Sequence, residues 1–443
     1  PKETSVHFLK LLHHNPYTGS IFLILSLLCM GNTFAADRYS DEALNKRIAS
    51  VLKKTPLVDG HNDLPMRYTI QVQGNLDQMP FTSDLSAIEQ PTHTDHARMV
   101  RGMMGGQFWS VYIPIAAYPG ASGDVARVLK QMDLVHRMIA TYPDQLELAL
   151  TAKEVISAHR RGKIASMMGI EGGHAIENSL ANLRMLYKVG ARYMTLTHSK
   201  GLRWADSATD EERVGGLSPF GKEVVHEMNR IGMLVDLSHV SVNAMNDALD
   251  VSSAPVIFSH SSAFALTAHK RNIPDEVLLR LKVNNGVAMV TFYPSYVSET
   301  VRLAWIDLRK KVNAQTDDPK EQTKLYRAQL STLPRPTLAD VADHIDHIRD
   351  LIGIDYIGLG GDYDGMPPGP IGMEDVSTYP ALLKELLRRG YSDADIAKIA
   401  GRNILRVMQD VEAVARKEQV RRLPSNAQID ELDAATPNPT GTL

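Results

Sequence analysis

Short apolar runs alternate along the chain with longer segments whose apolar residues recur at helical spacing. Most of these runs are almost continuously apolar, which is typical of strands buried on both faces of a parallel sheet. Repeated strand-then-helix units favour a closed (β/α)8 barrel of the TIM type over an open sheet. The eight predicted strands are 56–63, 108–113, 164–171, 193–198, 233–239, 255–260, 286–292 and 356–362.

Amphipathic helices are predicted between the strands. Ser40 can cap the first of them, which carries apolar residues from Leu44 to Leu52 on one face. Ser392 with Asp395 three residues later forms a capping-box pattern at the start of the last helix. Further helices are predicted at 124–141, 180–190, 221–232 and from Asn243 onward.

Polar residues with metal-binding side chains follow the apolar part of most predicted strands. His61 and Asp63 stand two residues apart, so on an extended strand their side chains face the same way. In a (β/α)8 barrel the chemistry is located at the C-terminal ends of the strands, and we expect the metal site there. The residues at these ends are His61, Asp63, Glu171, His198, His239, His260 and Asp362.

These strand ends offer more ligands than one metal ion needs. A two-metal site in which one carboxylate bridges the ions would account for the additional ligands. Glu171 is the best bridge, because its strand lies between the strand of His61 and the strands that carry the other histidines. Imidazole and carboxylate ligands without thiolate fit zinc, with cobalt or manganese as alternatives.

The first residues have the composition of a secretory signal peptide, predicted at 1–36. Basic residues precede an apolar run from Ile21 to Met30, and small residues follow it. The run is shorter than the roughly 20 residues that span a bilayer. We expect cleavage after Ala35 or Ala36 and export across the inner membrane to a bacterial periplasm.

The single cysteine of the chain, Cys29, lies inside this segment. Lipidation of Cys29 is the alternative, which Leu28 disfavours because a small residue usually stands there. The mature chain would then have neither disulfides nor a thiol nucleophile. The last residues, 436–443, form no apolar tail, so we expect no C-terminal lipid anchor.

Composition indicates a soluble globular protein without the bulk basic charge that nucleic-acid binding requires. The chain has 443 residues, of which 44% are hydrophobic and 22% charged, and a formal net charge of −3. We predict one barrel domain at 37–412 and a C-terminal tail at 413–443. The polar insertion 298–336 is expected to form surface helices, either a solvated excursion or a lid or subunit contact.

Several motifs together resemble the membrane (renal-type) dipeptidases, from about Val58 to Glu412. That family has amidohydrolase-type barrels and hydrolyses dipeptides with two zinc ions. The matching stretches follow one another in order along the chain. They are 59–63, 169–173, 196–198, 236–239, 258–261, 271–275, 360–365 and the segment from 374–377 through 403–407.

The resemblance implies a role for each site residue. His61 and Asp63 would bind the first zinc ion, His239 and His260 the second, and Glu171 both, with a hydroxide bridging the two ions as the nucleophile. The remaining implied roles are stabilisation of the substrate's carbonyl oxygen by His198, binding of its C-terminal carboxylate by Arg271, proton transfer by Asp362 and a substrate contact by Tyr293. A homodimer is expected, without the disulfides and membrane tether of the animal members.

Two other functions remain open. One is a different binuclear amidohydrolase, acting on an amide, a lactone or a β-lactam ring. The other is a catalytically dead barrel used for binding, against which the complete ligand set argues. Asp59 and His174 are interpreted as structural or supporting residues. Five more histidines are interpreted as surface or loop residues: His93, His96, His269, His344 and His347.

Overall fold

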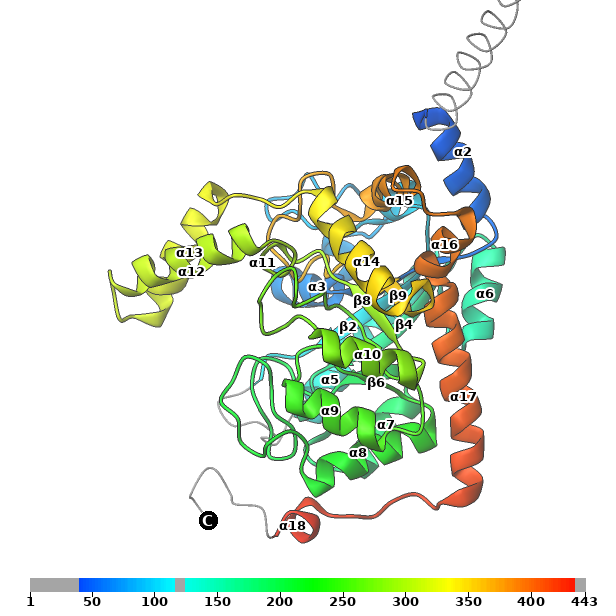
Figure 1. The fold of residues 1–443 in the computed structure, drawn as a ribbon, viewed down its shortest axis with the longest axis vertical. Coiled ribbons are helices and arrows are strands. Elements are labelled where there is room, and N and C mark those ends of the chain that lie inside the picture. Colours follow the sequence, from blue (N-terminus) through cyan, green and yellow to red (C-terminus); the bar gives the residue numbers. More distant parts are fainter. Residues whose placement is uncertain (1–39, 116–123, 435–443) are drawn as a thin grey trace, which may run out of the picture.

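The computed structural model describes residues 40–115 and 124–434 (Figure 1). All strands are parallel, in the order β2-β1-β9-β8-β7-β6-β5-β4-β3, and a further pairing of β2 with β4 closes eight of them into a barrel. The predicted (β/α)8 fold is therefore confirmed. The strands are β1 (Leu57–Asn62), β2 (Met104–Tyr112), β3 (Leu146–Leu148), β4 (Ile164–Glu171), β5 (Ala191–Thr195), β6 (Leu234–Asp236), β7 (Ile257–Phe258), β8 (Val287–Val290) and β9 (Ile357–Leu359).

The ninth strand, β3, was not predicted. It pairs with Ile164 to Ser166 at the start of β4, and β5 pairs with β4 from Met168 onward. Because β2 takes the other edge of β4, β3 and β5 follow one another along the same edge. β3 therefore lies outside the closed ring of eight. Its three residues are too few to show a period of two along the sequence.

β2 begins earlier than the predicted strand at 108–113. It starts at Met104 and includes Gly105 and Gly106. A Cβ atom on Gly105 would lie 2.7 Å from Pro56 Cα. Glycine is needed here because a neighbouring segment approaches the strand closely, and not because the chain turns.

Several predicted strands end earlier than expected, β6 and β9 among them. β6 ends at Asp236 and β9 at Leu359, although the apolar runs continue towards His239 and Asp362. His239 has a φ of +70° and Asp362 a φ of +62°, so the backbone has left the extended conformation before either residue. Such left-handed conformations are uncommon outside glycine and cluster at functional sites.

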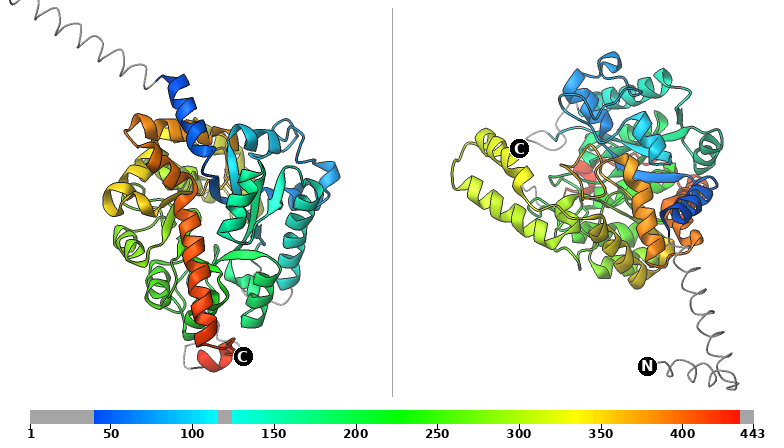
Figure 2. Two further views of the ribbon diagram at one scale, coloured as in Figure 1. Left: turned by 90° about the vertical axis from the view of Figure 1, so that its right-hand side faces the viewer. Right: turned by 90° about the horizontal axis from the view of Figure 1, so that it is seen from above.

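Helices cover the outside of the barrel (Figures 1 and 2). The predicted caps are present, since Ser40 accepts a hydrogen bond from the Ala43 amide and Ser392 forms a capping box with Asp395. The predicted last helix is divided by a π-turn at Lys398–Arg402. The helices are α2 (Asp41–Leu52), α3 (Leu64–Val72), α4 (His96–Arg101), α5 (Asp124–Thr141), α6 (Ala152–Arg160), α7 (Leu180–Lys188), α8 (Pro219–Ile231), α9 (Val242–Val251), α10 (Asp275–Asn284), α11 (Pro294–Val297), α12 (Glu299–Asn313), α13 (Pro319–Gln329), α14 (Leu338–Ile352), α15 (Tyr379–Arg388), α16 (Asp393–Ala397), α17 (Asn403–Arg421) and α18 (Ile429–Leu432).

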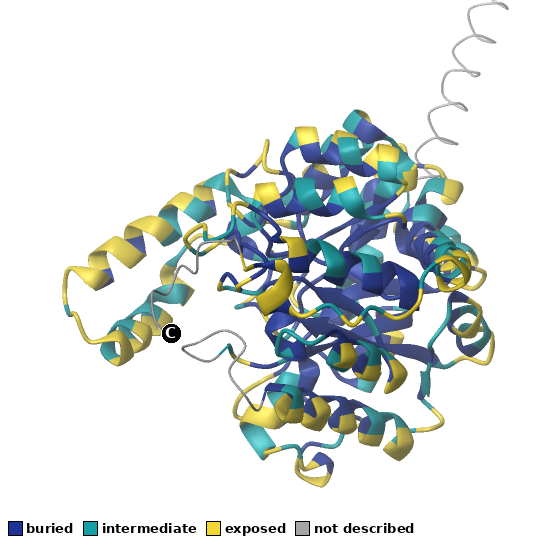
Figure 3. Cartoon of the chain, turned by 90° about the horizontal axis from the view of Figure 1, so that it is seen from below, coloured by how far each residue is buried: buried dark blue, intermediate teal, exposed yellow. Residues whose placement is uncertain are grey.

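The insertion after β8 forms a helical hairpin of α12 and α13 that projects from the barrel (Figure 2, right). The prediction of surface helices is confirmed. α13 buries none of its residues, and α12 buries only Val301, Leu308 and Val312. Figure 3 shows the same contrast, with exposed residues along the hairpin and buried ones in the barrel. The hairpin therefore adds little to the hydrophobic core.

The C-terminal residues are anchored on the barrel. α17 continues past residue 412 to Arg421 and packs against α8. Further along, Asp433 accepts hydrogen bonds from the Ser218 hydroxyl, at 2.6 Å, and from the Phe220 amide, at 2.9 Å, at the start of α8. The division into a barrel at 37–412 and a tail stays a prediction.

The predicted signal peptide and Cys29 lie outside the described residues. Within residues 40–115 and 124–434, no helix is both long and apolar enough to cross a membrane. Export to a periplasm and a homodimeric assembly stay predictions.

Candidate metal centre

The strand-end residues meet at the C-terminal end of the barrel. His61 lies near the end of β1, Glu171 is the last residue of β4, and Asp63 directly precedes α3. The loops that leave β5, β6, β7 and β9 carry His198, His239, His260 and Asp362, respectively. A cavity of about 510 Å³ opens over this cluster. Its walls include Asp63, Glu171, His198, His239, Arg271, Tyr293 and Asp362.

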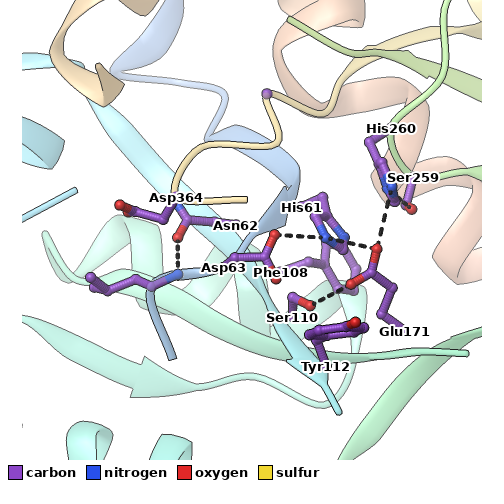
Figure 4. Close-up of polar contacts among 12 residues, drawn as sticks. His61, Asn62, Asp63, Phe108, Ser110, Tyr112, Glu171, Ser259, His260 and Asp364 are labelled. Carbon is purple, nitrogen blue, oxygen red and sulfur yellow. Dashed lines mark hydrogen bonds and ion pairs between the residues drawn. The ribbon is translucent and has the colours of Figure 1, made fainter. Parts of the chain in front are cut away.

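Glu171 lies close to four histidines, of which His61 and His260 are shown in Figure 4. Its Oε1 atom is 3.1 Å from Nε2 of His239 and 3.6 Å from the Nε2 atoms of His61, His198 and His260. Its other oxygen, Oε2, accepts a hydrogen bond from the Ser110 hydroxyl at 3.3 Å. One carboxylate oxygen thus faces four imidazole nitrogens, so these side chains converge on Glu171.

Two sets of ligand atoms adjoin Glu171. On one side, His61 Nε2 lies 3.3 Å from Asp63 Oδ2, with Asp362 close to both. On the other side, the Nε2 atoms of His239 and His260 are 3.0 Å apart. Within the described residues, His61 Nε2 is buried without a hydrogen-bond partner. Neighbouring groups of three or more such ligands are what a pair of ions requires.

The outer nitrogens of two histidines are held by hydroxyl groups. His61 Nδ1 lies 2.8 Å from the hydroxyl of Tyr193, which donates to the carbonyl of Gly60. His260 Nδ1 lies 2.8 Å from the hydroxyl of Ser259, which donates to Asp236 Oδ2 at 2.6 Å. Because each hydroxyl donates its own hydrogen to another oxygen, it accepts a hydrogen bond from the Nδ1–H group of the histidine. The lone pair of each imidazole is then on Nε2, which faces the cluster.

The charges of the cluster favour a bound cation. Burial raises the pKa of the Glu171 and Asp362 carboxyls, and Asp63 adds to both shifts. Burial lowers the pKa of the His239 and His260 imidazoles well below the usual value. Burial opposes protonation of His61 too, but Glu171 and Asp63 raise its pKa to about 10. The raised pKa of His61 reflects the negative potential of these carboxylates, whereas the His239 and His260 imidazoles are neutral. This set of imidazoles and carboxylates fits zinc.

Arg271 is a buried cation in the wall of the same cavity. Its side chain is 1% exposed, with Nη1 donating to Ser261 Oγ at 3.2 Å and Nη2 to the His260 carbonyl at 3.3 Å. Its Nε atom has no partner, and it forms no ion pair with a described acidic residue. A buried guanidinium is costly unless an anion compensates it. The geometry thus provides a place for an anionic group of a ligand.

The family model described as membrane dipeptidase (peptidase family M19) matches residues 45–422. This chain belongs to the membrane dipeptidase family. A relative, dipeptidase aclJ of Aspergillus oryzae, is 42% identical over 376 residues, which cover 83% of this chain and 81% of the relative. The predictions of the family and of a dipeptidase-type hydrolase are confirmed.

Solved structures at low identity share the fold of this dipeptidase. The probable dipeptidase PvdM of Pseudomonas aeruginosa superimposes with a TM-score of 0.74 at 23% identity, over 85% of this chain and all of that one. A metallopeptidase of Rhodobacter sphaeroides, solved with a phosphinate mimic of the dipeptide L-Ala-D-Ala, gives a TM-score of 0.64 at 24% identity, over 81% and 99% of the two chains. Both agree with the closed barrel described above.

Sequence reasoning missed several residues around the site of this dipeptidase. Tyr112, Thr209 and Tyr296 line its cavity. Thr209 and Tyr296 stand at no strand end, whereas Tyr112 is the last residue of β2 and could have been noticed by that position. Ser259 could have been noticed, because it directly precedes His260. The interpretation of His344 as a surface or loop residue is wrong. It is buried on α14, where its Nδ1 atom accepts a hydrogen bond from the Ala263 amide.

Proposed function

We propose that this enzyme hydrolyses the peptide bond of dipeptides with two zinc ions. His61 and Asp63 would hold the first ion, His239 and His260 the second, and Glu171 would contribute to both. The central position of Glu171 Oε1 among the four imidazoles supports this assignment. When bound, two zinc ions lower the pKa of a shared water from 15.7 towards about 7 and polarise the scissile carbonyl.

The observation that carries the proposal is the buried, uncompensated Arg271 in the wall of the metal-site cavity. A dipeptide has a free carboxylate one residue beyond its scissile bond. Arg271 can bind that carboxylate through parallel hydrogen bonds and hold the bond over Glu171. A longer peptide has no carboxylate at this position, so the same contact limits the substrate to dipeptides.

The other residues of the cavity act on the bond itself. His198 has the most exposed side chain of the four histidines, at 20%, and burial lowers its pKa to about 3. It is therefore neutral, and its N–H can donate to the carbonyl oxygen as negative charge develops. Asp362 accepts the proton of the attacking water and passes it to the leaving amine. Tyr293 contacts the substrate from the cavity wall.

The proposal predicts that Arg271 and the substrate carboxylate act as one pair. Arg271→Ala is expected to lower kcat/KM for a dipeptide by about 10- to 150-fold, since a charge-assisted hydrogen bond contributes roughly 1.5–3 kcal/mol. Lysine at this position should restore only part of the loss, because it cannot form the planar fork. The measurement is a double-mutant cycle of Arg271→Ala with a C-terminally amidated dipeptide.

In that cycle, the second change should cost little once the first has been made. Lys270→Ala is the matched control, because Lys270 is an exposed neighbour of Arg271. Fully additive losses would show that Arg271 does not read the carboxylate. Hydrolysis of amidated and free dipeptides at equal rates by the wild type would contradict the proposed substrate class, and activity that survives a chelator would contradict the metal.

A second prediction concerns the hydroxyl that orients His260. Ser259→Ala removes the link between His260 Nδ1 and Asp236, and we expect zinc affinity to fall by about 10- to 100-fold, the usual effect of losing such a partner. Affinity is measured by competition with a zinc-binding dye. Ser262→Ala is the control, because Ser262 is equally buried but donates to the Thr291 carbonyl. Unchanged affinity in Ser259→Ala would show that Ser259 does not position a ligand.

A further inference from the structure

A second cavity, of about 320 Å³, adjoins the one over the metal centre. It lies between the loop after β8 and the α12–α13 hairpin, and we call it the hairpin cavity. Thr209, Tyr293 and Tyr296 line both cavities, so the two are neighbours across a shared wall. The volume falls within the range of about 300–1,000 Å³ that is usual for small-molecule sites.

Aromatic rings continue from the shared wall into the hairpin. Tyr293 and Tyr296 are stacked with their ring centroids 4.2 Å apart. Trp305 of α12 meets Tyr293 edge-on at 5.7 Å, and Tyr326 of α13 meets Trp305 edge-on at 6.3 Å. The guanidinium of Arg309 lies 5.3 Å from the Tyr326 ring. This chain of rings gives the cavity a wall suited to a flat apolar group.

Core packing does not account for the two aromatic residues of the hairpin, Trp305 and Tyr326. α13 buries no residue, and Trp305 and Tyr326 are only partly buried although they pack against one another. Both side chains face a cavity that solvent can enter. Large aromatic groups that line an open cavity, and not a core, are typical of a binding surface.

The hairpin cavity opens beside the carboxylate-binding arginine. Tyr296 lies between them, with its ring 5.5 Å from the Arg271 guanidinium and 4.2 Å from the His269 ring. The metal ligands do not line this cavity. A dipeptide bound through Arg271 thus brings its C-terminal residue, and not its N-terminal one, to the shared wall.

We propose that the hairpin cavity binds the side chain of the C-terminal residue and selects dipeptides in which this side chain is a large aromatic group. The assignment rests on the proposed function, because Arg271 sets the direction of the substrate. The hairpin is then a specificity element that the insertion adds to the barrel. A small side chain would not contact the aromatic wall and would gain no binding free energy from it.

The test compares Ala-Trp, Trp-Ala and Ala-Ala as substrates of the wild type, Trp305→Ala and Tyr326→Ala. We expect either variant to lower kcat/KM for Ala-Trp by about tenfold, mainly through KM, because the lost ring contacts act on binding. The values for Trp-Ala and Ala-Ala should change by less than about twofold. Trp305→Phe should retain most of the activity on Ala-Trp.

Leu303→Ala is the matched control, because Leu303 is on α12, 52% exposed and not in the cavity wall. Equal losses on all three substrates would assign the hairpin a structural role and overturn the inference. So would a loss on Trp-Ala in place of Ala-Trp, or no loss at all. If the wild type hydrolyses none of the three, the proposed function fails, and the assignment of the cavity fails with it.

Discussion

Replacement of Glu171 by glutamine is expected to remove zinc binding and activity together. Glutamine has almost the same shape but no charge, so the four imidazoles would lose the one anionic oxygen that faces them all. Bound metal supplies several kcal/mol of transition-state stabilisation, and about 4 kcal/mol corresponds to a factor of about 10³. We therefore expect kcat/KM to fall by at least about 10³-fold.

The metal content of purified Glu171→Gln, measured by mass spectrometry after dialysis, distinguishes a lost ligand from a lost acid–base group. Glu212→Gln serves as the control, because Glu212 is an exposed glutamate in the loop between β5 and α8. The metal-free wild type, Glu171→Gln and Glu212→Gln should unfold at similar temperatures. Full zinc occupancy with normal turnover in Glu171→Gln would rule out a bridging role for this residue.

Asp362→Asn is expected to lower kcat by about 10²- to 10⁴-fold while the fold and most of the zinc are retained. The loss is that of a general acid–base group, since an amide can neither accept the proton nor return it to the leaving amine. The backbone at Asp362 has a φ of +62°, a conformation that asparagine adopts more readily than most residues. The substitution should therefore preserve the loop.

The decisive measurement is kcat together with zinc content for the same preparation of Asp362→Asn. Asp355→Asn is the matched control, because Asp355 is an exposed aspartate just before β9, at the opposite end of that strand. A rate within a few-fold of the wild type would refute proton transfer by Asp362. A parallel loss of zinc and rate would make Asp362 a metal ligand instead.

The order of the elements could be predicted from the sequence, because periodicity is a local property. The apolar run at 164–171 and the helix at 124–141 coincide with β4 and α5 in the structure. Hydrophobic residues repeat with the period of the element they form, and parallel strands buried on both faces leave a continuous apolar run. The polar residues that follow these apolar runs could also be recognised in the sequence, because they mark where each run ends.

Family motifs extended this prediction to individual residues, but they carried no distances. The approach of His61, His198, His239 and His260 to Glu171 depends on strand order, register and the closure of β2 on β4. These residues lie far apart in the sequence, so no local sequence pattern predicts the distances between them in the folded protein. The positive φ at His239 and Asp362 also arises from the way the loops leave the barrel.

Only the tertiary structure identified what supports and surrounds the centre. In the sequence, Ser259 and Tyr193 look like ordinary strand residues. The structure shows that their hydroxyl groups lie within hydrogen-bond distance of the Nδ1 atoms of His260 and His61, respectively. In the sequence, Trp305 and Tyr326 are part of a polar insertion. Only the structure shows that they line the hairpin cavity beside the metal-site cavity. The sequence by itself determined which element each residue joins, because that depends on neighbours along the chain. The site depends on contacts between distant elements, which only the packed barrel creates.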